Sequence, residues 1–375
     1  MRYLGGIENL EGIDHVLKGK KLGLLTNFSG IDSKFNSDVD ILNSRYDLIR
    51  LFAPEHGLRG ELQAGEKVSS YIDEKIGIEV VSLYGSPADG VLDGVECLLY
   101  DIQDVGVRHF SYPYLMAKMM KKCAEKGIPF VVLDRYNPLG LSKISGNIYD
   151  DKFQCGVGGY SLATRYAMTV GELAGYVNAE YNVNCELYVA PCVGIDRSVD
   201  HYELSTHWIP PSPNCPTFDT VLCYVGNVLF EGTNVSEGRG TTKPFELIGA
   251  PWLKNEELVE KMKSFELEGV DFRASYFTPT FSKYKGELCH GIQLHIKDRD
   301  SYDSYLCALL LIYNIRKMHK EFEFLSSDGH SYFFDRLAGT SIIRNEDFDP
   351  IEYVRSQKPH LEEFKARSEK YYIYR

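Results

Sequence analysis

The chain has 375 residues, of which 44% are hydrophobic and 25% are charged, and its formal net charge is −12. This length is typical of two domains, and the composition is that of an ordinary globular protein. The negative charge disfavours nucleic acid and anionic membrane surfaces as partners, because both are bound through basic surfaces.

The cysteines and the N-terminus indicate a compartment. The nine cysteines are scattered, and no pair has C-x-x-C spacing, which is typical of free thiols in a reducing compartment. The first residues contain no apolar signal-peptide core, and no run of the chain is long enough to span a bilayer. We therefore expect a cytoplasmic protein.

Short apolar runs alternate with amphipathic segments through the first half of the chain. The runs predict strands at residues 21–27, 48–52, 78–83, 95–101, 129–134 and 186–190, and the segments predict helices at 38–46, 114–126 and 169–181. Strands that are apolar throughout indicate a parallel sheet with helices on both faces. We predict an α/β fold with a Rossmann-like, doubly wound, mostly parallel sheet.

The character of the chain changes after Pro251. A proline-rich connector (210–216) and a predicted helix (217–230) precede this point. Beyond it, the patterns predict helices at 255–265 and 302–320 and strands at 274–281 and 291–296. We therefore predict two domains, a Rossmann-like domain over residues 1–249 and a smaller α+β auxiliary domain over 250–375.

Polar side chains follow three predicted strands at the point where each strand ends. They are Glu55, His56 and Arg59 after the second strand, Asp101, Gln103, Asp104, Arg108, His109 and Tyr112 after the fourth, and Asp134, Arg135 and Asn137 after the fifth. The carboxyl ends of parallel strands meet at one edge of the sheet, where open α/β sheets bind their ligands. The alternative is a set of structural ion pairs, for example between Asp101 or Asp134 and Arg108 or Arg135.

Several cofactor signatures are absent from the sequence. No G-x-G-x-x-G follows the first strand, and the segment from Gly238 to Lys243 does not have the order of a Walker motif. No H-x-H or H-E-x-x-H spacing is present. We expect no nucleotide cofactor and no metal.

A second polar segment lies between residues 230 and 252, where three glutamates, Asn234 and Arg239 stand in a glycine-rich frame. Its glutamates are Glu231, Glu237 and Glu246. Long irregular stretches inside compact domains are usually functional. As a lid over the strand ends, this segment would bring a carboxylate and an arginine to the cleft, whereas the alternative is an exposed connector.

Five motifs carry a resemblance to a known family. They are PEHG-L-RG (54–60), DIQDVGVRHFSY (101–112), DRYNPLG (134–140), PPSPN-PT (210–217) and EGTNVSEGRGTTKPFE-IGAPW (231–252). In this order they resemble the bacterial exo-acting β-N-acetylmuramidases, a family formerly described only as a domain of unknown function. The resemblance implies removal of N-acetylmuramic acid from the non-reducing end of peptidoglycan fragments, with Glu55 as a catalytic residue.

The residues themselves agree with a glycosidase, which needs an acid for the leaving oxygen and a second group as base or nucleophile. Glu55 is the predicted acid, and Glu237, Asp101 and Asp104 are the candidates for the second role. An arginine, for which Arg239, Arg108 and Arg59 are the candidates, would pair with the lactyl carboxylate of a muramic acid.

The predicted catalytic set is therefore Glu55, Glu237 and Asp104. The predicted substrate-binding set comprises His56, Arg59, Asp101, Gln103, Arg108, His109, Tyr112, Asn137, Asn214, Asn234 and Arg239. Two alternatives to the glycosidase are a metal-dependent hydrolase that uses the histidines and aspartates of the strand ends, and a muropeptide-binding protein without catalysis.

Overall fold

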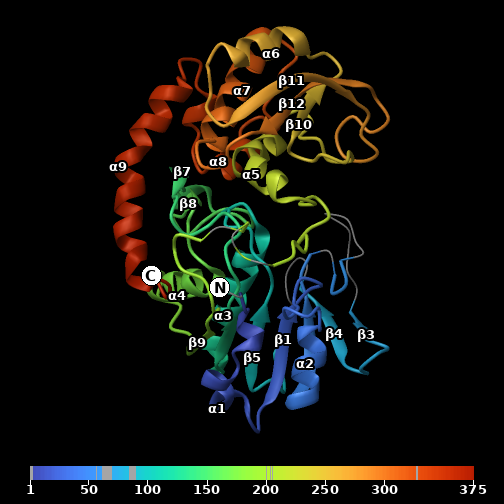
Figure 1. The fold of residues 1–375 in the computed structure, drawn as a ribbon, viewed down its shortest axis with the longest axis vertical. Coiled ribbons are helices and arrows are strands. Elements are labelled where there is room, and N and C mark those ends of the chain that lie inside the picture. The colour runs from blue at the N-terminus through green and yellow to red at the C-terminus, as the bar shows by residue number, and fades with distance from the viewer. Residues whose placement is uncertain are drawn as a thin grey trace.

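The structure is a computed structural model that describes residues 3–55, 57–60, 70–83, 90–199, 201–202, 204, 206–326 and 328–375. Figure 1 shows a larger part built on a sheet, a smaller part above it, and one long helix that runs along the side of both. Among the described residues, no helix is both long and apolar enough to cross a bilayer.

The larger part is built on a seven-stranded sheet in the order β3-β4-β2-β1-β5-β6-β9. Its strands are β1 (Lys21–Thr26), β2 (Asp47–Ala53), β3 (Tyr71–Ile72), β4 (Glu79–Ser82), β5 (Cys97–Asp101), β6 (Phe130–Leu133) and β9 (Leu187–Ala190). Every neighbouring pair is parallel except β3 with β4 at one edge. Without β3, the strand order is that of a Rossmann fold, with the switch point between β1 and β5. The predicted fold class is confirmed.

Helices cover both faces of this sheet. On one face lie α1 (Asp14–Leu17) and α2 (Asp38–Arg45), and on the other lie α3 (Ser111–Lys126) and α4 (Val170–Glu180). Alternate residues of each central strand enter the two cores, as Leu99 and Tyr100 do in β5. This double burial explains why the central strands are apolar throughout.

The smaller part contains the antiparallel sheet β10-β12-β11. Its strands are β10 (Leu247–Ala250), β11 (Val270–Phe277) and β12 (Cys289–Ile296), and its helices are α5 (Phe218–Asn227), α6 (Asn255–Lys263), α7 (Ser304–Met318) and α8 (Phe333–Ala338). The predicted boundary at residue 250 falls at the end of β10, and α5 packs against α7. Whether the two parts fold independently at that boundary stays a prediction.

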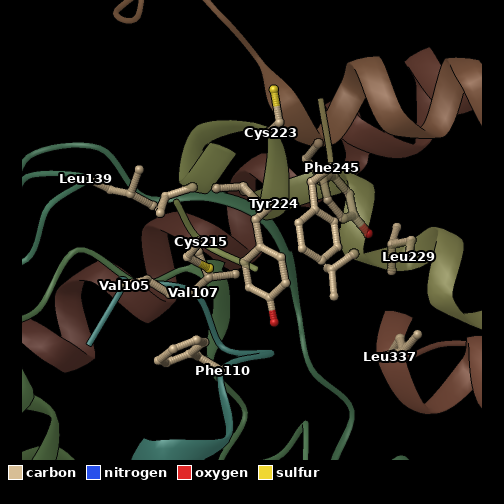
Figure 2. Close-up of a cluster of buried hydrophobic side chains, with 14 of the residues drawn as sticks. Val105, Val107, Phe110, Leu139, Cys215, Cys223, Tyr224, Leu229, Phe245 and Leu337 are labelled. Carbon is tan, nitrogen blue, oxygen red and sulfur yellow. The ribbon is translucent and has the colours of Figure 1, made fainter. Parts of the chain in front are cut away.

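One hydrophobic cluster joins the two parts. It extends from Leu25 and Tyr100 in the large sheet to Leu309 and Tyr353 in the C-terminal helices. Figure 2 shows the middle of this cluster, where residues that follow β5 meet residues of α5 and α8. A short β-hairpin, β7 (Ser145–Ile148) and β8 (Ala163–Arg165), lies beside this junction. All nine cysteines are free thiols.

The last helix, α9 (Pro350–Ser368), carries the chain back to the larger part. Beyond it, the hydroxyl of Tyr374 donates to Asp134 Oδ2 (2.6 Å) and accepts from the backbone N–H of Cys192 (2.7 Å). Glu172 Oε1 accepts from the backbone N–H groups of Ile373 (2.8 Å) and Tyr374 (3.2 Å). The final residues are therefore fixed at the ends of β6 and β9.

Tyr374→Phe should lower the free energy of unfolding by about 1–3 kcal/mol, because it leaves the buried Asp134 carboxyl without one of its donors. Urea denaturation measures this change, with an unaltered m-value as evidence that the same surface unfolds. Tyr371→Phe is the matched control, since among the described residues its hydroxyl bonds to Glu180 alone (2.7 Å), whose side chain is partly exposed. Its free energy of unfolding should stay within about 0.5 kcal/mol of the original. Equal losses in both variants would contradict the anchoring role of Tyr374.

Candidate active site

A cavity of about 520 Å³ lies between the two parts of the molecule. Its floor comes from the end of β2 and the start of α3, and its roof comes from α5, α8 and the loops before β10 and β12. The polar residues that line it are Glu55, His109, Ser111, Tyr112, Ser212, Tyr224, Glu231, Glu237, Arg239, Ser282 and Lys283. Apolar walls are contributed by Phe110, Val157, Val228, Phe281, Phe333 and Leu337.

Glu55 reaches the cavity because Pro54 follows the last residue of β2 and Gly57 turns the chain with a φ of 78°. The Ser111 hydroxyl donates to Glu55 Oε2 at 3.4 Å. The Tyr112 hydroxyl contacts the backbone oxygens of Glu55 (3.3 Å) and Pro211 (3.0 Å), which fixes the loop. The neighbouring His56 lies outside the described residues.

Opposite charges alternate across the roof of the cavity. Arg239 Nη2 donates to Glu231 Oε1 (2.6 Å), and Arg239 Nε lies 3.4 Å from Glu237 Oε1. Lys283 Nζ donates to Glu237 Oε2 at 2.8 Å. Burial raises the pKa of Glu231 above its ordinary value, and the positive charge of Arg239 opposes this rise. The two cations of the roof are therefore already paired with carboxylates.

Two glycines bring this charge network together. At Gly240, whose φ is 81°, an added Cβ would lie 2.6 Å from the carbonyl oxygen of Phe281. At Gly238 an added Cβ would lie 2.6 Å from the carbonyl oxygen of Leu247. No side chain fits these positions, so the loop that carries Lys283 can pack directly on the backbone beside Arg239.

His109 forms part of the cavity wall but is held by the protein. Its Nε2 lies 2.8 Å from the carbonyl oxygen of Leu337, and because a carbonyl only accepts, Nε2 carries the proton. Burial lowers the pKa of His109 well below its ordinary value, and the adjacent Arg108 lowers it further. His109 is therefore neutral and does not supply a cation to the site.

Other predicted site residues make contacts within the protein and do not line the cavity. Two of them form ion pairs, Asp101 with Arg135 and Arg59 with Asp73. Arg108 donates hydrogen bonds to Asn147 and Ala338, and Asp104 accepts one from Tyr166. The side-chain amides of Gln103, Asn137 and Asn234 donate to the backbone oxygens of Tyr136, Met168 and Glu321, respectively. Asn214 is buried, and its Nδ2 has no partner among the described residues. Burial raises the pKa of Asp104 to about 6. A role of Asp104 in catalysis, and of the other residues in binding, stays a prediction.

Of the predicted residues, the cavity brings together Glu55, His109, Tyr112, Glu237 and Arg239. Sequence reasoning missed the roles of Lys283, Tyr224 and Glu231 in its lining. The sequence could have placed Glu231 at the site, because it belongs to the same glycine-rich segment as Glu237 and Arg239. No sequence pattern identified Lys283, since its loop reaches the site through tertiary packing alone. Among the described residues, no group of three or more His, Cys, Asp or Glu side chains is placed to hold a metal ion.

Comparisons with known proteins cover nearly the whole chain. The models of the N-terminal and C-terminal parts of the exo-β-N-acetylmuramidase NamZ match residues 22–219 and 222–374. The peptidoglycan β-N-acetylmuramidase NamZ of Bacillus subtilis (strain 168) is 46% identical over 367 residues, which cover 96% of this chain and 88% of that protein.

Two crystal structures of DUF1343 family proteins from Bacteroides fragilis have the same fold. One is 31% identical with a TM-score of 0.89, and the other is 30% identical with a TM-score of 0.80. Each comparison covers 100% of this chain and 99% of the solved one. With both family models matched in order and a relative at 46% identity, the chain belongs to the NamZ family of exo-β-N-acetylmuramidases.

Proposed function

We propose that this protein is a glycoside hydrolase that removes N-acetylmuramic acid from the non-reducing end of peptidoglycan fragments. The named activity of the Bacillus subtilis relative and the two matched family models support this proposal. The observation that carries it is the carboxylate-lined cavity between the two parts of the chain. Its volume of about 520 Å³ is that of a site for a small ligand.

The cavity offers the groups that glycoside hydrolysis requires. Two carboxyl groups must flank the bond, one to protonate the leaving oxygen and one to act at the anomeric carbon. Glu55 enters from the floor, and Glu231 and Glu237 enter from the roof. Phe281 and Phe333 provide apolar surface for the faces of sugar rings.

The direct test uses a disaccharide with N-acetylmuramic acid β-linked at its non-reducing end. Incubation with the protein should release free N-acetylmuramic acid, identified by mass. Binding without release would indicate a muropeptide-binding protein instead. Dialysis against a strong chelator should leave the rate unchanged, whereas a loss that a divalent ion restores would favour the metal-dependent hydrolase.

Glu55→Gln should lower kcat by about 10²–10⁴-fold, because glutamine has nearly the same shape but cannot donate the proton of a carboxylic acid. The rate is measured on the disaccharide, whose leaving sugar needs protonation, and circular dichroism checks the fold. Glu125→Gln, on the exposed face of α3, is the control and should keep the original kcat. A near-normal kcat in Glu55→Gln would remove Glu55 from catalysis.

Arg239→Ala tests the prediction that this arginine recognises the lactyl carboxylate. Loss of a charged hydrogen bond costs about 1.5–3 kcal/mol, so kcat/KM should fall by about ten- to a hundredfold for the muramic acid glycoside. The matching N-acetylglucosamine glycoside lacks the carboxylate, so kcat/KM for this glycoside should fall far less. Because Arg239 also pairs with Glu231 and Glu237, an equal loss for both glycosides would assign it to the positioning of those carboxylates.

A further inference from the structure

A second catalytic carboxyl group needs an oxygen atom that can contact a substrate in the cavity. Asp101 is paired with Arg135, Asp104 accepts from Tyr166, and neither residue lines the cavity. Glu237 does line it, but its side chain is only 2% exposed and its two oxygens face Arg239 and Lys283. These three candidates are engaged in the structure of the protein.

Glu231 differs from them in its exposure and in its free oxygen. Its side chain is 24% exposed, and Oε1 accepts from Arg239 at 2.6 Å. Its Oε2 forms no hydrogen bond with the part of the chain that the structure describes. A carboxylate with one oxygen fixed and the other open to the cavity is positioned and still available for chemistry.

Tyr224 lines the same cavity as Glu231 and Glu55. Burial raises the pKa of the Tyr224 hydroxyl well above its ordinary value, and the negative charges of Glu231 and Glu55 both raise it further. In Figure 2 this hydroxyl points into the space between Phe110 and Leu337, which also line the cavity. Glu231 and Glu55 therefore share one cavity with this hydroxyl.

We propose that Glu231 is the second catalytic carboxylate, acting on the α face of the anomeric carbon while Glu55 protonates the leaving oxygen on the β face. This inference rests on the proposed glycosidase function. Arg239 favours the ionised form of Glu231, and burial makes that carboxylate a stronger base than one in water. Glu237 and Lys283 hold Arg239 in place and are positioning residues.

The reaction at the anomeric carbon forms one bond and breaks one. A bond from an oxygen to C1 forms on the α face as the bond between C1 and the leaving oxygen breaks on the β face. The electron pair of the broken bond stays on the leaving oxygen, which takes the proton of Glu55. If the attacking oxygen belongs to Glu231, a glycosyl ester forms; a water that gives its proton to Glu55 then attacks C1 from the β face, the ester bond breaks with its electron pair on Glu231, and the β anomer is released first. If the attacking oxygen belongs to a water whose proton Glu231 takes, the α anomer is released first. The first anomer released by the unaltered enzyme therefore distinguishes the two routes.

Chemical rescue with azide tests the role of Glu231. Glu231→Ala should lower kcat by about 10²–10⁴-fold on both the disaccharide and the 4-nitrophenyl β-glycoside of N-acetylmuramic acid. Added azide should then restore turnover of the 4-nitrophenyl glycoside, because it fits the space of the missing carboxylate. It attacks C1 from the α face, the electron pair of the broken bond leaves with 4-nitrophenolate, and the product is the α-glycosyl azide. Glu231→Gln, which keeps the shape of the site, should show the same loss without azide.

Glu237→Ala is the matched control, because it also removes a carboxylate from Arg239. It should lower kcat without any rescue by azide. Rescue of Glu237→Ala, no rescue of Glu231→Ala, a β-glycosyl azide, or a near-normal rate in Glu231→Gln would each overturn the proposal. If the unaltered protein hydrolyses neither substrate, the proposed function fails instead.

Discussion

A buried guanidinium holds the two parts of the molecule against each other. Arg108 is fully buried, donates to Asn147 O (2.6 Å) and Ala338 O (2.9 Å), and lies over the ring of Tyr149. Burial lowers the pKa of this arginine, yet the guanidinium keeps its charge. The carbonyl oxygens at the end of α8 stabilise a cation, because that end of a helix carries negative partial charge. Phe333 and Leu337 of α8 therefore lie at the cavity, and the roof of the site depends on this contact.

The site does not lie at the switch point between β1 and β5, where Rossmann folds ordinarily bind their ligands. There the hydroxyl of Thr26 donates to Asp38, while Asp101 pairs with Arg135. Any side chain at Gly30 would collide with the carboxyl of Asp38. At this crevice the protein therefore pairs its own polar groups with one another, and smaller cavities of about 110 and 280 Å³ remain beside them. The cavity lies instead at the end of the neighbouring strand β2, where the smaller part covers Glu55.

The sequence predicts those features that are encoded by neighbouring residues. The central strands and most helices followed from apolar runs and periodicity, and Glu55 followed from a strand interrupted by Pro54. The helix α9 was missed because its 19 residues bury only Pro350, Tyr353, Phe364 and Ser368, which form no apolar stripe. The polar edge of the sheet was predicted, and Arg135 was one of the partners considered for Asp101, but the sequence could not decide between that ion pair and a contact with substrate. Whether an aspartate meets an arginine, as Asp101 does, or a substrate depends on contacts between segments far apart in the chain.

The C-terminal residues are made last, yet they complete the larger part of the molecule, which is built mainly from the first half of the chain. Tyr374 bonds to Asp134 across 240 residues of sequence, and its hydroxyl also caps the backbone of Cys192. On the ribosome, the parallel sheet emerges long before these residues do. Until they are made, the buried Asp134 carboxyl lacks the hydrogen bond from Tyr374. Contacts of such long range form late and slow the completion of the fold. The last strand of the sheet ends at Ala190, so the nascent sheet stays unfinished while the second half of the chain is made, and a chaperone would protect it during that interval.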